Sequence, residues 1–448
     1  MLSYKKLHYK ARLEFFVHIS RYLALITIST MLLFILAGCM VTNVSPDGTS
    51  STAATATTTT HNNKRHHGNT NRTAKNIKAA PPPSSLPPSP ITVHFQKKEF
   101  KNLIAWHHDN HLQAFNALCD SCRIIMRKKD HNSQMNRFSN IGGKVSDWVP
   151  ACSKALNSKI TNNKQARMFF ETNFHAYAVL NDAKNDMGKF TGYYEMEING
   201  SRKRSSKYKY PIYKAPRNLK QLQGTKALEH ASINRGALQN KGLEIFWVDD
   251  RIKLFYMHIQ GSGIIKLSDR TKVRVTFDGH NGFSYSSITK YFSQYTGISP
   301  KSTEEMIRWL KHHPADAQKI MERNKSYVFF KEKPSLSAGP VGAQGVTLHP
   351  ERSIAVDYYI FPYGVPFWVE AKLPKITNYH NVNINYHKLM IAQDTGGSIR
   401  GAIRGDIFFG NSERASDVVN HMNCAGRYYA LFPREVVVRE SYKITNKN

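Results

Sequence analysis

From Phe190 to the end of the chain, short apolar or aromatic runs alternate with glycine and proline. Runs of this length suit β-strands, and glycine and proline between them favour turns. A helical interruption is expected at residues 302–322, where Ser302 and Glu305 have the spacing of a capping box, and another near 412–423. The sequence therefore predicts a body that is mainly β with accessory helices. The predicted strands are Leu243–Val248, Leu254–Ile259, Val273–Phe277, Ile354–Val356, Phe367–Val369, Leu389–Gln393 and Tyr428–Phe432.

The amino-terminal region indicates export from the cytoplasm. Five basic residues precede the uncharged apolar run Tyr22–Gly38, whose 17 residues are at the short limit for a membrane-spanning helix. The run ends in Leu36-Ala37-Gly38-Cys39, which resembles the bacterial lipobox, so we expect residues 1–38 to be a signal peptide and Cys39 to be lipidated. A plain membrane anchor is the alternative. Residues 39–95 are rich in threonine and proline and are expected to form a disordered tether.

A helical segment is expected before the strands, over residues 101–180. Cys119 and Cys122 share one face of its first helix, and adjacent turns of one helix are a poor place for a disulfide bond. We therefore predict that Cys122 pairs with Cys152, and that Cys119 and Cys424 are small buried hydrophobic residues. A redox Cys-x-x-Cys motif is disfavoured because no strand precedes it.

Three aspartates, Asp357, Asp394 and Asp406, each follow or enter an apolar strand. Because Ile407, Phe408 and Phe409 follow Asp406, its carboxyl group would be desolvated, which raises its pKa and suits a proton donor. Asp394-Thr395-Gly396 is also the aspartic protease triplet, but the second copy that this chemistry needs is absent. No metal-ligand spacing and no Walker-type loop occur, so we predict no metal and no cofactor.

The chain is strongly basic, with 63 Lys and Arg against 32 Asp and Glu, a formal net charge of +31. Such a charge indicates an acidic partner, and residues 201–225 combine eight basic side chains with tyrosines. Tyrosine faces suit stacked bases or sugar rings. Because the chain is predicted to be exported, an acidic sugar polymer is favoured over nucleic acid, and a solvated hairpin is the plain alternative.

Seven blocks, in order along the chain, resemble the membrane-bound lytic murein transglycosylase A (MltA) family. Its carboxy-terminal module is the 3D domain, whose three aspartates match Asp357, Asp394 and Asp406. The blocks are Phe190–Glu195 with Pro211–Lys214, His258–Gly263, Gly279–Gly282, Tyr285–Ile288, Asn324–Phe330, Ala392–Gly397 and Gly405–Phe408.

The resemblance implies a double-psi β-barrel made from residues 96–200 and 336–448, an inserted β domain at 201–335, and a glycan groove between them. It implies a non-hydrolytic, exolytic enzyme that cleaves the β-1,4 bond between N-acetylmuramic acid and N-acetylglucosamine and leaves 1,6-anhydromuramic ends. By this resemblance, Asp406 corresponds to the single catalytic acid of the family, and Asp357 to a supporting residue. The groove-lining residues of the family correspond to Thr191, Tyr194, Gln260, Ser262 and Asp394 in this chain.

The expected location is the outer membrane, with the lipid-anchored protein facing the periplasm. The expected partners are peptidoglycan glycan strands and cell-wall synthesis or hydrolysis complexes. Two alternatives stay open: a non-catalytic peptidoglycan-binding lipoprotein, and a hydrolytic muramidase that uses both Asp406 and Asp394. His230-Ala231-Ser232-Ile233 and Met196 depart from the family pattern, which puts the efficiency of substrate engagement in question more than the reaction type.

Overall fold

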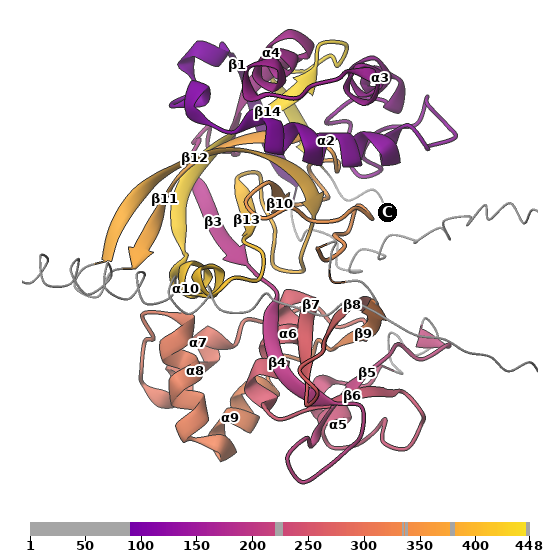
Figure 1. Ribbon diagram of the computed structural model, residues 1–448. Coiled ribbons are helices and arrows are strands. Elements are labelled where there is room, and N and C mark those ends of the chain that lie inside the picture. Colours follow the sequence, from indigo (N-terminus) through magenta and orange to yellow (C-terminus); the bar gives the residue numbers. More distant parts are fainter. Residues whose placement is uncertain (1–89, 220–226, 334–335, 337–338, 377–380, 445–448) are drawn as a thin grey trace, which may run out of the picture. The chain divides into compact units, whose positions relative to one another are not determined.

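Two β-sheets organise the protein. The computed structural model describes residues 90–219, 227–333, 336, 339–376 and 381–444 (Figure 1). The predicted signal peptide, Cys39 and most of the predicted tether lie outside the described residues. The larger sheet contains β1 (Ile91–Lys98), β2 (Phe174–Leu180), β3 (Gly188–Tyr193), β10 (Ser353–Ala355), β11 (Pro366–Ile376), β12 (Asn381–Asp394), β13 (Arg404–Phe408), β14 (Cys424–Pro433) and β15 (Ser441–Ile444). The smaller contains β4 (Met196–Ser201), β5 (Tyr210–Tyr213), β6 (Glu244–Val248), β7 (Ser262–Leu267), β8 (Lys272–His280) and β9 (Val328–Lys333).

Six strands of the larger sheet close into a barrel. Their order is β11-β12-β10-β13-β3-β14, and β14 pairs with β11 to complete the ring. The pairs β10–β12 and β13–β3 are parallel, and the other neighbours are antiparallel. Strands β2, β1 and β15 continue outward from β14. Closure leaves the six strands with no free edge. The predicted fold class, a β-barrel with a second β domain, is confirmed.

Helices α2 (His111–Ile125), α3 (Val149–Asn157) and α4 (Asn163–Asn173), indigo to purple in Figure 1, pack on the barrel and share its main apolar core. The Asn110 side chain caps α2 by accepting a hydrogen bond from the Gln113 backbone N–H. A disulfide joins Cys122 of α2 to Cys152 of α3, which is the predicted pair. Cys119 is buried with a free thiol. Short 3₁₀ turns occur at Phe100–Asn102, Trp106–His108 and Val145–Trp148.

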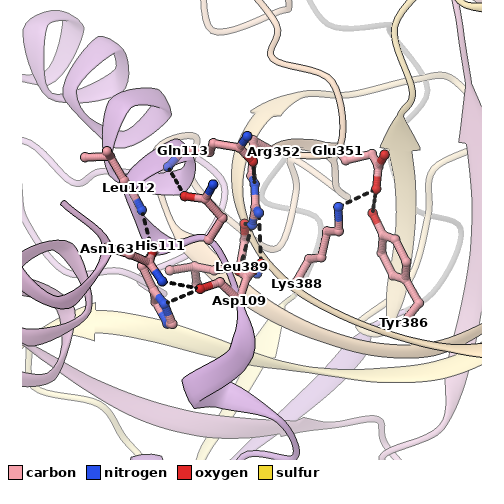
Figure 2. A network of polar contacts seen from close by, with 11 residues as sticks. Asp109, His111, Leu112, Gln113, Asn163, Glu351, Arg352, Tyr386, Lys388 and Leu389 are labelled. Carbon is pink, nitrogen blue, oxygen red and sulfur yellow. Dashed lines mark hydrogen bonds and ion pairs between the residues drawn. The ribbon is translucent and has the colours of Figure 1, made fainter. Parts of the chain in front are cut away.

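A buried ion pair attaches this helical layer to the barrel (Figure 2). Arg352 donates to both carboxylate oxygens of Asp109, at 2.7 and 2.8 Å, and the Leu389 backbone N–H donates to the same carboxylate at 2.8 Å. Desolvation by itself would raise the pKa of Asp109, but the hydrogen bonds and charge of Arg352 outweigh it and lower the pKa. Asp109 lies just before α2, so the pair ties the start of that helix to β12.

The smaller sheet has its own apolar core, formed with four of its helices. These are α6 (Arg251–Gln260), between β6 and β7, and the group α7 (Ile288–Thr296), α8 (Thr303–His312) and α9 (Pro314–Met321), salmon in Figure 1. The short α5 (His230–Asn234) and α10 (Glu413–His421), which follows β13, complete the helices of the described chain. The helices expected at 302–322 and near 412–423 are confirmed, and Ser302 caps α8 as predicted.

Two element predictions are wrong. Leu254–Ile259 lies in helix α6, because Asp250 caps it by accepting from the Ile252 and Lys253 backbone N–H groups and Gly261 ends it at a left-handed φ of 78°. Apolar residues occur all round this helix, so its sequence does not reveal the helical period. Phe174–Leu180 is strand β2, although its apolar residues also fit helical spacing, because it pairs with β1 and β14.

The chain passes from the barrel to the smaller sheet between Tyr193, the last residue of β3, and Met196, the first of β4. This is a few residues ahead of the predicted boundary at residue 200. At the other end, β1 begins at Ile91, within the segment predicted as tether.

Candidate active site

A cleft of about 770 Å³ lies between the barrel and the smaller sheet. The barrel contributes the end of β3, the loop after β12 and the start of β13. The smaller sheet contributes the end of α6 and parts of β7, β8 and β9. Of the predicted site residues, Thr191, Gln260, Ser262, Asp394 and Asp406 line this cleft. Residues as far as 215 positions apart in the sequence therefore meet at one place.

Asp406 is held in the cleft by a neighbouring strand. The register of β13 on β3 sets it beside Thr191, whose hydroxyl donates to Asp406 Oδ1. Arg404 also lines the cleft, and its Nη2 donates to Thr191 Oγ1 at 2.8 Å. Desolvation raises the pKa of Asp406, and it outweighs the lowering by Arg404 and by the Thr191 hydrogen bond. A raised pKa favours the protonated form of the carboxyl group, which can donate that proton.

Asp394 is surrounded by hydrogen-bond donors. The Tyr193 hydroxyl donates to Asp394 Oδ2 at 2.7 Å, and the backbone N–H groups of Ala343 and Thr395 donate to Oδ1 at 2.9 Å each. Desolvation nevertheless raises the pKa of Asp394 to about 6, and the charge of Asp406 adds to this shift. Both carboxylate oxygens are thus engaged by the protein itself.

Asp357 does not line the cleft. Its side chain is fully buried and accepts from the Gly401 N–H at 2.7 Å and the Tyr359 N–H at 3.1 Å. Gly401 belongs to the loop between Asp394 and Asp406. Asp357 therefore supports the loop that connects the two cleft aspartates, and the structure brings two of the three aspartates together.

Tyr194 does not line the cleft with its side chain, but its backbone N–H donates to Gln260 Oε1 at 3.0 Å and so holds a cleft residue. Its ring packs against both apolar cores, where the chain crosses from one sheet to the other. The two departures from the family pattern, His230 and Met196, are buried away from the cleft lining.

Sequence reasoning missed several residues around the site. Tyr193 lies within one of the motifs and Arg404 directly precedes another, but neither was assigned a role, and their contacts to Asp394 and Thr191 depend on strand register. Glu195 and Arg274 form a buried pair, with Arg274 Nε and Nη2 donating to the carboxylate at 2.8 and 3.0 Å. An acid and an arginine 79 residues apart give no sequence signal of pairing.

The described residues contain no group of three or more His, Cys, Asp and Glu side chains that could hold a metal ion. Asp394 and Asp406 both line the cleft. Asp406 has a raised pKa, and its Oδ1 accepts a hydrogen bond from the Thr191 hydroxyl. This is an arrangement for general acid–base catalysis by one carboxyl group.

Two family models match the chain. One is described as the MltA specific insert domain and matches residues 189–331, and the other is the 3D domain, which matches residues 352–432. The membrane-bound lytic murein transglycosylase A of Vibrio cholerae is 30% identical over 246 residues, which is 54% of this chain and 64% of that protein. The protein of the same name from Escherichia coli K12 is 32% identical over 249 residues, covering 54% of this chain and 65% of that protein. The chain thus spans slightly less than two thirds of these curated relatives.

Solved structures match over a longer part of the chain. A lytic transglycosylase of Burkholderia pseudomallei is 32% identical, with 80% of this chain and 99% of that chain covered and a TM-score of 0.50. A membrane-bound lytic murein transglycosylase from Agrobacterium tumefaciens is 27% identical, with 76% and 98% covered and a TM-score of 0.67.

A closed β-barrel of the 3D-domain type, interrupted by a second β domain that completes an aspartate-bearing cleft, defines the class of this protein. Within that class, the chain belongs to the MltA family, as its sequence motifs predicted. Among the residues that the structure describes, no helix combines the length and hydropathy needed to cross a membrane.

Proposed function

We propose that this protein is a lytic transglycosylase that cleaves peptidoglycan glycan strands between N-acetylmuramic acid and N-acetylglucosamine. The observation that carries the proposal is a carboxyl group with a raised pKa, Asp406, in a cleft between two β domains. The names of the similar proteins from Agrobacterium tumefaciens and Burkholderia pseudomallei support the reaction class. Hydroxyl and amide side chains on the facing wall, Ser262, Thr276 and Gln260, suit a sugar ligand.

The reaction needs one carboxyl group in two states. Protonated Asp406 donates its proton to the oxygen that links the two sugars, and the bond from that oxygen to C1 of the muramic residue breaks. The Asp406 carboxylate then accepts the proton of the C6 hydroxyl of the same sugar, whose oxygen bonds to C1. The product is a 1,6-anhydro end, and no water is consumed.

Hydrolysis would need a second carboxylate that activates water or attacks C1. Asp394 is the candidate in this cleft, but the Tyr193 hydroxyl and two backbone N–H groups occupy its oxygens. Because these donors use lone pairs on both oxygens, Asp394 has little acceptor capacity left for a water molecule or for attack on C1. The geometry thus favours the lyase over the hydrolytic muramidase.

The test is digestion of purified sacculi in ¹⁸O-labelled water, with the muropeptides analysed by mass spectrometry. The wild type should release anhydro ends without label, and Asp406→Asn should release none. Asp182→Asn, an exposed position outside the cleft lining, is the matched control and should behave as the wild type. Labelled reducing ends would overturn the lyase, and binding without products by wild type and variant alike would favour the non-catalytic binder.

The proposal extends to location. Residues 1–38 act as the signal peptide, Cys39 carries the lipid, and the body faces the periplasm from the outer membrane, with cell-wall synthesis or hydrolysis complexes as protein partners. Support comes from the lipobox-like sequence and from the words "membrane-bound" in the names of the relatives. Growth with labelled palmitate should label the wild type but not Cys39→Ser, and equal labelling of the two would refute lipidation at Cys39.

A further inference from the structure

Arg404 and Asp406 lie two residues apart on β13, so their side chains project from the same face of that strand. β13 runs parallel to β3, and the register places Asp406 beside Thr191. All three side chains line the cleft. Two adjacent strands therefore bring a guanidinium, a hydroxyl and the proposed catalytic carboxyl together.

The three groups form a directed chain of hydrogen bonds. Arg404 Nη2 donates to Thr191 Oγ1 at 2.8 Å, and Thr191 Oγ1 donates to Asp406 Oδ1. A guanidinium has donors only, so its bond fills a lone pair of the hydroxyl oxygen and directs the hydroxyl proton elsewhere. The acceptor on the other side is Asp406 Oδ1. Arg404 Nη1 also donates to the Gly405 carbonyl at 2.5 Å, which fixes the guanidinium against its own strand.

We propose that Arg404 is a positioning residue that, through Thr191, makes Asp406 Oδ1 a fixed acceptor and so places the transferable proton on Oδ2. The inference rests on the proposed transglycosylase function. The Thr191 hydroxyl donates to Oδ1 in both charge states of Asp406, so the same oxygen, Oδ2, gives up the proton to the glycosidic oxygen and later takes the C6 hydroxyl proton.

The charges around Asp406 agree with this role. Asp394 lies in the same cleft and repels the carboxylate, and Tyr193 donates to Asp394. Tyr428, whose hydroxyl donates to the Ala402 carbonyl, also interacts with Arg404. Arg404 supplies the positive charge that lowers the pKa of Asp406 against desolvation. The cleft lysines are engaged elsewhere: Lys331 lies 3.6 Å from Asp278, and Lys333 donates to the Gly339 carbonyl at 3.0 Å.

The experiment measures kcat and KM for anhydro-muropeptide release against pH, with the full chain. Removing the charge in Arg404→Met raises the pKa of Asp406, so Asp406 stays protonated to higher pH. The alkaline limb of the kcat/KM profile should therefore shift to higher pH by about one unit. At the wild-type optimum, kcat should fall by about 10- to 100-fold, the range expected for loss of charge-assisted hydrogen bonds, with KM little changed. Arg404→Lys keeps the positive charge and should return the alkaline limb to its wild-type pH. It should not restore the full kcat, because an ammonium group lacks the planar set of N–H donors of a guanidinium.

Thr191→Val should move the limb in the same direction as Arg404→Met. The double variant should be no slower than the slower single variant, because both changes break one chain. Arg414→Met, an exposed arginine of α10 outside the cleft lining, is the matched control and should leave the pH profile in place. The positioning role would be wrong if the alkaline limb of kcat/KM in Arg404→Met stayed at its wild-type pH and the losses of kcat added up in the double variant. Arg404 would then have a structural role.

A second measurement separates this inference from the proposed function. The ¹³Cγ resonance of Asp406, assigned by its loss in Asp406→Asn, reports the titration of the carboxyl group directly. Its midpoint should be higher in Arg404→Met and in Thr191→Val than in the wild type, whether or not the protein releases anhydro products. An unchanged midpoint contradicts the inference even if the enzyme is an active lyase.

Discussion

Asp394 gives a quantitative test, because its carboxylate accepts three hydrogen bonds and yet has a raised pKa. The perturbation is Asp394→Asn. The amide oxygen can still accept from the Ala343 and Thr395 N–H groups, and the NH₂ group can donate to the Tyr193 oxygen once that hydroxyl rotates. The substitution therefore removes the negative charge while keeping the number of hydrogen bonds.

The magnitude follows from proton linkage. The pKa of Asp394 is about 6 in the folded protein, against an ordinary value of 3.8. The folded state therefore holds this proton more tightly than the unfolded chain. Its contribution to stability is present below about pH 4 and is lost as the pH rises through about 6. A shift of about two units at 1.36 kcal/mol each amounts to roughly 3 kcal/mol, an upper limit because Asp394 retains some contact with solvent.

The assay is urea unfolding of wild type and Asp394→Asn between pH 4 and 7.5. We expect the variant to be more stable at pH 7.5, by about 2 to 3 kcal/mol, with the difference vanishing toward pH 4. The difference in unfolding free energy between the two proteins cancels the contributions of other titrating groups. Among these are the buried histidines His111 and His230, whose pKa values are lowered to about 4 by burial. If the wild type were instead more stable than the variant, by a margin that grows with pH, the raised pKa of Asp394 would be wrong. The three hydrogen-bond donors would then stabilise the carboxylate by more than desolvation destabilises it.

The same variant also distinguishes the two enzyme mechanisms. Asp394→Asn should still form anhydro ends, at a reduced rate, because the reaction proposed for Asp406 needs no second carboxylate. Complete loss of products in a folded variant would return Asp394 to a direct chemical role.

Three further predictions follow from other parts of the structure. Cys152→Ala should lower the free energy of unfolding by about 2 to 4 kcal/mol in urea unfolding, because the disulfide closes a loop across a sequence separation of 30, and reduction of the variant should cost nothing more. Glu195→Gln breaks the buried ion pair with Arg274, in which both side chains are at most 4% exposed, so we expect the free energy of unfolding to fall by about 3 to 5 kcal/mol, with partial recovery when Arg274→Met is added. Arg202, one of five exposed cations in the β4–β5 connection, pairs with Glu332 and is kept. Glutamine at the other four exposed cations should weaken sacculus binding about tenfold in low salt and little near 1 M salt, and unchanged binding would indicate that the charge does not attract substrate. These cations are Lys203, Arg204, Lys207 and Lys209.

The local sequence predicted helices correctly where a helical spacing of apolar residues or a capping side chain marks them. The helices at 302–322 and near 412–423 begin at Ser302 and Ser412, whose side chains cap them as short polar residues do. It failed for Leu254–Ile259, where the apolar run fits a strand or a buried helix and the deciding groups, Asp250 and Gly261, lie outside the run. It also failed for Phe174–Leu180, whose conformation is fixed by pairing with strands distant in the sequence.

Residue types and their order along the chain predicted the family, the β class and the candidate aspartates. The shared helix face of Cys119 and Cys122 led to the Cys122–Cys152 prediction, which the disulfide confirms. The fold was needed to show that Asp394 and Asp406 share the cleft while Asp357 supports the loop between them. It also decided that Thr191 and Arg404 act on Asp406 and that Glu195 pairs with Arg274. Strand pairing and barrel closure set these contacts between segments tens to hundreds of residues apart, because alternation along one strand decides which face a residue takes but not which distant strand lies beside it.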